Sequence, residues 1–417
     1  MISGLRTMTA SSAEAVDRIS LNLWLVFFLC FLSNLFGGLV STLMSVYLPM
    51  AVTELSGEQS MGSLGDISAI INSQYIFGWT AGGLAWGLIS DLIGRVRAFI
   101  FTFGLYGLFT LLTSLATSWE MLVIFRLLTG FGVGGVMVVS VTYMSEIWPE
   151  RTRSIFIGIM SIGFPVGIFS AGLTNYIISD WRMGFLNGMI PLAMALISIA
   201  VFRESEIWKN SRIGHNMGLN MTELKQNKKD LLKGSIVFGS MLIGMWAVFS
   251  WLPTWMQSIL HNGGGQEERG IGMMLMGIGG LTGGFFSGWI SNGIGLRKAL
   301  LICFAGCLSI AIVMFSNNTS FSQVIYLETG VMAIFFGISQ GALGAYIPQL
   351  FKPGIRATAT GFCFNMARLL TGTAVFFIGT LVVSLGGYGN TLLVFSSVFL
   401  IGLIAVFYSR DPKESEI

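Results

Sequence analysis

The chain has 417 residues, of which 53% are hydrophobic and only 10% charged, and its mean hydropathy is +0.76. Soluble domains carry about 25% charged residues, so this composition excludes an ordinary soluble globule and predicts a membrane protein. The net charge of +3 gives no reason to expect a nucleic-acid partner. All four cysteines lie within apolar segments, which predicts packing roles for them and neither a disulfide framework nor a zinc site.

Apolar segments long enough to cross a bilayer follow one another along the whole chain. Twelve are predicted, at residues 22–50, 67–89, 97–117, 120–143, 154–178, 182–202, 232–258, 270–291, 298–316, 322–346, 357–385 and 388–408. Helices are expected because the strands of a barrel would alternate apolar and polar residues over about ten positions. The expected fold class is an all-α membrane protein with twelve transmembrane helices.

The longest polar interruption follows the sixth segment and divides the chain into two halves. The expected organisation is a cytoplasmic N-terminal segment at 1–21, a six-helix bundle at 22–203, a cytoplasmic linker at 204–231, a second six-helix bundle at 232–408 and a cytoplasmic tail at 409–417. With both termini in the cytoplasm, 19 of the 23 Lys and Arg residues fall in cytoplasmic segments. External loops then hold only Arg182 and Arg269. This asymmetry predicts a multi-pass protein of the inner or plasma membrane with both termini cytoplasmic.

Two short strings occur twice, once in each half. The charged hinge Gly87–Arg97 reads GLISDLIGRVR, and a degraded copy, GWISNGIGLRK, occupies Gly288–Lys298, 201 residues later. The second pair, SEIWPERTRS at Ser145–Ser154 and PQLFKPGIRA at Pro348–Ala357, is offset by 203 residues. The repeats predict two pseudo-symmetric halves, alternating access and a substrate site near the midplane between them.

These motifs resemble those of the major facilitator superfamily over nearly the whole chain. The hinge resembles the loop 2–3 signature of the family, and the glycine-rich run Arg126–Gly135 resembles its fourth-helix motif. The segment Arg203–Trp208 resembles the end of helix six in sugar and organic-acid porters, with both of their prolines missing. Trp251–Pro253 and Asn365–Leu370 resemble the aromatic-acid and sialate/lactate branches. The resemblance implies a secondary transporter of small metabolites.

Two departures bear on the coupling of transport. Many proton-coupled relatives carry an Asp about nine residues before the Leu-Pro that ends helix one. Here Leu48-Pro49 is present, but the first apolar segment contains no acid. The antiporter signature of helix five is present only in part, at Gly163–Gly167, which disfavours drug/proton antiport. Proton symport remains the expectation by resemblance, and facilitated uniport or exchange remains open.

Two arginines lie inside apolar segments, where charges are costly and are functional candidates by default. Arg126 can bind a substrate carboxylate through two parallel hydrogen bonds, or it can be a structural arginine held by carbonyls of the first segment or by Glu328. Arg368 shares a polar stripe with Asn365 and is expected to bind substrate, with a tie between helices as the alternative. Glu328 is the proton-coupling candidate, and a glutamate hydrated at the external mouth is its alternative.

Polar and aromatic stripes in segments one, two and seven offer further candidates. Such stripes can line a cavity that binds a small organic molecule, or they can pack helices together. The complete set of predicted substrate-binding residues is Arg126, Arg368, Asn365, Asn34, Tyr75, Trp246 and Gln257.

The duplicated strings also predict a cytoplasmic gate. Its expected members are Asp91, Arg95, Glu146, Arg153 and Arg356. In the family, such residues form a salt-bridge network that closes the cytoplasmic side in outward-open states. Amides, Asn292 and Gln349, replace the two acids in the second half. We therefore expect a one-sided latch and a resting state that leans inward-open.

The sequence contains no nucleophile–base set, metal-ligand cluster or phosphate-binding loop. We therefore expect neither an enzyme nor a bound cofactor or metal. The predicted function is secondary transport of a small organic anion, a carboxylate or acidic sugar, by a monomer in contact with membrane lipid, with protons as coupling ions. The alternatives are a neutral-sugar transporter and a facilitated uniporter or exchanger without proton coupling.

Overall fold

The structure is a computed structural model, and it describes residues 20–57, 61–211, 226–260, 264–352 and 355–409. Within these ranges all regular elements are helices, and twelve helices or runs of consecutive helices are long and apolar enough to cross a membrane. The predicted fold class, an all-α membrane protein with twelve transmembrane helices, is confirmed.

The first six crossings occupy residues 21–201. They are α1 (Leu21–Ser56), α2 (Met61–Ile93), α3 (Arg95–Thr113), α4 (Trp119–Ile147), α5 (Glu150–Ile177) and a broken crossing made of α6 (Trp181–Phe185), η1 (Leu186–Gly188) and α7 (Met189–Val201). A short helix, α8 (Glu206–Ser211), follows. The last six are α10 (Lys228–Ser258), α11 (Gln266–Ile294), α12 (Leu296–Asn317), α13 (Val324–Gln349), α14 (Arg356–Thr380) and a crossing made of α15 (Tyr388–Ser396) and α16 (Val398–Phe407).

Two expectations about the first and eighth crossings were wrong. Helix α1 continues past residue 50 to Ser56, because Pro49 is accommodated inside the helix and the chain turns only at Gly57, which has φ +67°. Membrane helices tolerate an internal proline because neighbouring groups satisfy the freed carbonyl. Arg269, which was expected in an external loop, lies in the first turn of α11 and is only 1% exposed.

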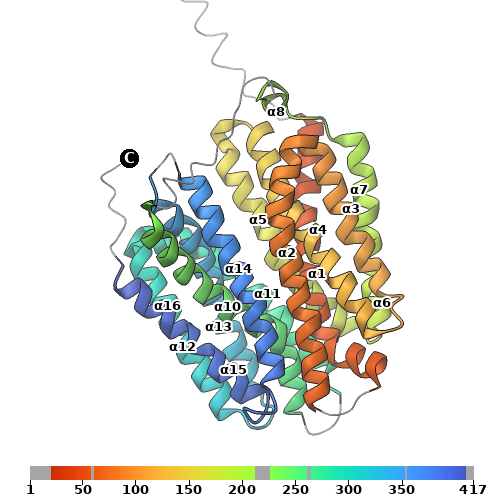
Figure 1. Cartoon of the computed structure of the whole chain (residues 1–417), viewed down its shortest axis with the longest axis vertical. Coiled ribbons are helices and arrows are strands. Elements are labelled where there is room, and N and C mark those ends of the chain that lie inside the picture. The colour runs from red at the N-terminus through yellow and green to blue at the C-terminus, as the bar shows by residue number, and fades with distance from the viewer. Residues whose placement is uncertain (1–19, 58–60, 212–225, 261–263, 353–354, 410–417) are drawn as a thin grey trace, which may run out of the picture.

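The helices of residues 21–201 lie on one side of the molecule and those of residues 228–407 on the other (Figure 1). Helix α2 contacts α14, and α5 contacts α11, across the line between the two groups. These contacts are closest at the end opposite α8. A Cβ on Gly65 would lie 2.7 Å from Gly379 O, and a Cβ on Gly172 would lie 2.5 Å from Gly270 O. The glycines therefore let backbones meet at this end, and space between the groups is left nearer to α8.

Candidate functional site

A cavity of about 500 Å³ lies between the two groups of helices. Residues from α2, α4, α5, α10, α11, α13 and α14 line it. On α5, α10 and α13 the lining residues come from the middle of each helix and from its half nearer to α8, as Ser161, Phe238 and Gly344 illustrate. The cavity therefore occupies the part of the interface that the glycine contacts leave unfilled. Its size suits a small organic molecule.

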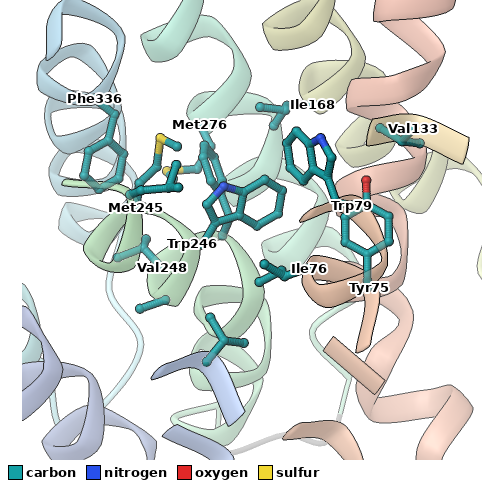
Figure 2. Close-up of a cluster of buried hydrophobic side chains, with 14 of the residues drawn as sticks. Tyr75, Ile76, Trp79, Val133, Ile168, Met245, Trp246, Val248, Met276 and Phe336 are labelled. Carbon is teal, nitrogen blue, oxygen red and sulfur yellow. The ribbon is translucent and has the colours of Figure 1, made fainter. Parts of the chain in front are cut away.

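Aromatic rings form much of the wall where the two groups meet. Trp79 of α2 and Trp246 of α10 pack edge to face, with ring centroids 5.2 Å apart. Trp79 also stacks on Phe164 of α5 at 5.8 Å. Figure 2 shows Trp246 and Trp79 side by side, with Tyr75 beyond them. Trp246 lines the cavity, as its predicted role requires, and Trp79 is a lining residue that the predicted set omitted.

Arg368 on α14 is the one charged side chain among the described residues that line this cavity. Its Nη1 lies 3.5 Å from Oδ1 of Asn365, and its Cζ lies 5.4 Å from the centroid of the Trp79 ring. No carboxylate of a described residue lies within 4.0 Å of the guanidinium. The guanidinium of Arg368 thus lies beside an aromatic ring and forms no ion pair with a described residue, so it can pair with an anion.

Asn365 lies beside Arg368 but belongs to the wall of a different cavity. This second cavity, of about 360 Å³, lies between α2 and α14 and is lined largely by apolar residues such as Phe77, Leu84 and Phe362. The Asn365 amide donates to Gly361 O at 2.9 Å. The two residues of the polar stripe predicted on α14 therefore line different cavities, and only Arg368 lines the central one.

Arg126 on α4 is 1% exposed and lies outside the described lining of the central cavity. Its Nη1 donates to Val40 O at 2.9 Å and its Nη2 to Ser41 O at 3.3 Å. Its Cζ also lies 4.1 Å from the centroid of the Tyr75 ring. The guanidinium therefore joins α4 to the backbone of α1, and no bond to Glu328 forms.

Three further predicted substrate ligands have partners within the protein. The Asn34 amide donates to Cys30 O at 2.9 Å and to Ser140 Oγ at 3.2 Å. The Tyr75 hydroxyl is hydrogen-bonded to the Ser41 hydroxyl. Gln257 accepts a hydrogen bond of 2.5 Å from Arg269 Nη1. None of the three is among the described residues that line the central cavity.

Glu328 lies in the second turn of α13 and is 8% exposed. Its Oε2 accepts a hydrogen bond of 2.8 Å from Asn318, just past the end of α12. Four helical turns separate it from Gly344, which marks the α8 side of the cavity wall on the same helix. The proton-coupling candidate is thus buried and hydrogen-bonded, and it lies apart from Arg368.

Three predicted gate residues come together at the α8 end of the first group. Arg95 Nη1 lies 2.5 Å from Asp91 Oδ1, and Arg95 Nε lies 3.0 Å from Glu146 Oε1. The Arg95 side chain is 11% exposed, so this network is partly shielded from solvent. Arg153 and Arg356 lie outside the network, and each donates from Nε to a backbone carbonyl near the start of its own helix.

One acid that the sequence prediction omitted lies next to these predicted gate residues. Glu204, just before α8, accepts hydrogen bonds from the backbone N–H groups of Arg95 at 2.9 Å and of Val96 at 3.4 Å, at the N-terminus of α3. A carboxylate is favoured there because the first N–H groups of a helix lack intrahelical partners. Gly94 has φ +105°, and a Cβ on it would lie 2.2 Å from Glu204 Oε2. The motif Arg203–Trp208 was the available signal for this contact.

Two other polar residues were missed. Arg269 donates to Gln257 and lies 3.6 Å from Met50 Sδ, so it connects α11 with α10 and α1. Gln340 lines the central cavity from α13. A basic residue next to two acids looks like a loop in sequence, and a single glutamine in a membrane segment carries no periodic signal.

Comparison with known proteins gives a consistent result over most of the chain. The family model described as Major Facilitator Superfamily matches residues 23–372. The cis,cis-muconate transport protein of Acinetobacter baylyi is 24% identical over 420 residues, covering 96% of this chain and 98% of the relative. The gallate transporter of Pseudomonas putida is 27% identical over 404 residues, covering 87% and 86%. The crystal structure of a D-xylose-proton symporter superposes with a TM-score of 0.77 at 15% identity, covering 95% and 100%.

Proposed function

The chain belongs to the Major Facilitator Superfamily, a family of membrane transporters, and from that premise we propose that it carries a small organic anion bound at Arg368. The observation that carries this proposal is the unpaired guanidinium of Arg368 in the wall of the central cavity. A carboxylate can accept two parallel hydrogen bonds from an arginine, and a site partly shielded from water strengthens that interaction. The transporters of muconate and gallate among the relatives support an acidic substrate.

The cavity wall supports an organic anion with an apolar or planar body. Trp79, Trp246 and Phe249 surround the space with aromatic rings, which bind flat apolar groups by stacking and by burial of apolar surface. A neutral sugar would leave the positive charge of Arg368 without a counter-charge. The anion is therefore preferred over the sugar.

We also propose the orientation of the protein in the membrane. The basic residues in the first turns of α3, α5 and α12, such as Arg97, Arg151 and Lys298, belong to the α8 end, and the positive-inside rule assigns that end to the cytoplasm. The central cavity lies toward this end, and the glycine contacts close the other. The arrangement is then inward-open, and transport requires the α8 end to close while the opposite end opens.

The anion is tested by thermal shift of the purified protein with carboxylates and neutral sugars. Carboxylates should raise the melting temperature of the wild type, whereas Arg368→Ala should weaken carboxylate binding by roughly 10- to 100-fold, as expected for loss of a charged hydrogen-bond partner. Arg97→Gln is the matched control, since Arg97 is exposed and outside the cavity. Stabilisation by neutral sugars alone, or carboxylate binding that survives Arg368→Ala, would overturn the proposal.

Coupling to protons is a separate part of the proposal. We propose symport in which Glu328 takes up and releases the proton, since it is a buried carboxylate in a membrane helix. In proteoliposomes, an imposed pH gradient should drive uptake by the wild type, and Glu328→Gln should lose this uptake while it retains exchange of internal for external substrate. Uptake that ignores the gradient in the wild type would instead favour facilitated uniport.

A further inference from the structure

Gln340 on α13 presents a side-chain amide to the central cavity. Its Nε2 is buried, and no hydrogen bond of this side chain forms with any described residue. A hydroxyl of the wall is engaged, since Ser161 Oγ donates to Ile157 O at 3.0 Å. Gln340 is therefore an uncharged polar group of the wall with free hydrogen-bonding capacity.

An unsatisfied amide inside a membrane protein is unfavourable, and nearly all buried polar groups in native structures have a partner. The terminal torsion of a glutamine is soft, so the amide can turn its N–H groups or its oxygen toward the cavity. No internal hydrogen bond opposes this rotation. A molecule in the cavity can therefore supply the missing partner.

The backbone of α13 near Gln340 packs closely against α11. A Cβ on Gly337 would lie 2.3 Å from Gly280 O, and a Cβ on Gly283 would lie 2.1 Å from Ile334 O, so α13 and α11 meet backbone to backbone beside this residue. Such close packing fixes the position from which the amide projects. A group fixed in this way can discriminate between ligands by geometry.

Gln340 and Arg368 lie at a similar depth on two different helices. At 1.5 Å per residue, Gln340 is roughly 14 Å from the end of α13 and Arg368 is roughly 18 Å from the start of α14. That end and that start lie close together, because Arg356 Nε at the start of α14 donates to Phe351 O, two residues past the end of α13, at 3.3 Å. One ligand lying across the cavity at this level can therefore contact both side chains.

We propose that Gln340 determines substrate specificity by hydrogen-bonding a second polar group of the anion held at Arg368. The ligand class is an organic acid with a carboxylate at one position and a hydroxyl, carbonyl or second carboxylate oxygen at another, joined by an apolar body that lies against Trp79 and Trp246. This inference rests on the proposed binding of an anion at Arg368. A plain apolar monocarboxylate would leave the Gln340 amide unpaired.

The test compares benzoate with the three monohydroxybenzoates, which share a carboxylate and a ring and differ in one hydroxyl. Dissociation constants are measured with purified protein by isothermal titration calorimetry. At least one hydroxylated isomer should bind the wild type about tenfold more tightly than benzoate, because a site built around a hydrogen bond rejects the analogue that lacks it. Gln340→Leu should bring this ratio close to one and leave the affinity for benzoate in place.

Ser161→Ala is the matched control, since Ser161 lines the same cavity and its hydroxyl already has an internal partner. It should keep the wild-type ratio. Gln340→Glu provides a second variant of nearly unchanged volume, and it should reject terephthalate, a dicarboxylate, far more strongly than benzoate.

The outcomes distinguish a failure of the role proposed for Gln340 from a failure of anion binding at Arg368. Equal weakening of benzoate and the hydroxybenzoates by Gln340→Leu would make Gln340 a structural residue and overturn the inference, while anion binding at Arg368 would stand. The absence of any preference in the wild type would overturn it in the same way. If the wild type binds none of these carboxylates and Arg368→Ala changes nothing, the proposed function fails and the inference fails with it.

Discussion

Arg153 and Arg356, 203 residues apart in the chain, make the same contact in the two halves of the molecule. Arg153 Nε donates to Trp148 O at 3.2 Å, and Arg356 Nε donates to Phe351 O at 3.3 Å. Each bond spans five residues at the start of a membrane helix. The equivalence supports a duplication, and it gives a reference point from which the differences between the halves can be measured.

One of these differences is the charge of the predicted gate. Arg95 contacts two carboxylates in the first half, whereas Arg297 in the second donates to the carbonyl oxygens of Val406 at 3.3 Å and Phe407 at 2.5 Å. We expect the double variant Asn292→Asp, Gln349→Glu to stabilise closure of the α8 end. An exposed ion pair contributes about 0–1 kcal/mol, which shifts a two-state population up to several-fold.

External labelling of Ser161→Cys measures this shift in a background without the four native cysteines. Labelling from outside should become several-fold faster in the double variant, because Ser161 lines the cavity. The reference is the Ser161→Cys protein that keeps Asn292 and Gln349. An unchanged labelling rate would contradict the one-sided latch.

The two membrane arginines should respond differently to removal. Arg126→Ala should lower the melting temperature measured without ligand. The variant loses two hydrogen bonds to carbonyls of α1 and the cation–π contact with Tyr75, and each of these interactions contributes about 1 kcal/mol. Arg368→Ala should leave that temperature nearly unchanged and abolish the shift produced by carboxylates. If Arg126→Ala melts like the wild type and loses the carboxylate shift, Arg126 is a substrate ligand, as its place in the sequence predicted.

Gly130, one of several glycines at the α2–α4 interface, gives a prediction about packing. A Cβ on Gly130 would lie 2.1 Å from Tyr75 O, so Gly130→Ala must push two helices apart. Overpacking of this kind costs about 1–3 kcal/mol, and the melting temperature should fall. Gly288→Ala is the control, because a Cβ there meets nothing within 4 Å. Equal melting temperatures for the two variants would contradict the close approach.

Arg182 joins three segments at the end opposite α8. Its Nη1 donates to Ser114 O at 3.0 Å and to Ala116 O at 2.7 Å, and its Nη2 lies 2.9 Å from Glu54 Oε1. The ion pair is half exposed and contributes about 0–1 kcal/mol, whereas each carbonyl bond contributes about 1 kcal/mol. Arg182→Ala should therefore lower the melting temperature more than Glu54→Gln, and equal losses in the two variants would assign the stability to the ion pair, which both of them remove.

Much of the architecture was predictable because bilayer thickness imposes a length on every apolar segment. The twelve crossings follow from that constraint. The partners of polar side chains were harder to predict, because periodicity indicates which residues share a helix face and not which neighbour that face meets. Arg126 and Arg368 look alike in sequence, yet one contacts backbone carbonyls and the other lines a cavity. Gln257 was predicted to bind substrate, and in the structure its side chain accepts a hydrogen bond from Arg269.

The closed end of the interface has a mechanical property that follows from its glycines. At Gly65–Gly379 and Gly172–Gly270 the two groups touch main chain to main chain, and side chains such as Met274 and Tyr176 pack beside the second contact. At the points of contact themselves no side chain separates the two backbones. Resistance to separation then comes from dispersion forces and from a few hydrogen bonds, such as that of Gln266 to Asn175 O at 2.7 Å. Contacts of this kind can separate and form again with little rearrangement of the hydrophobic core.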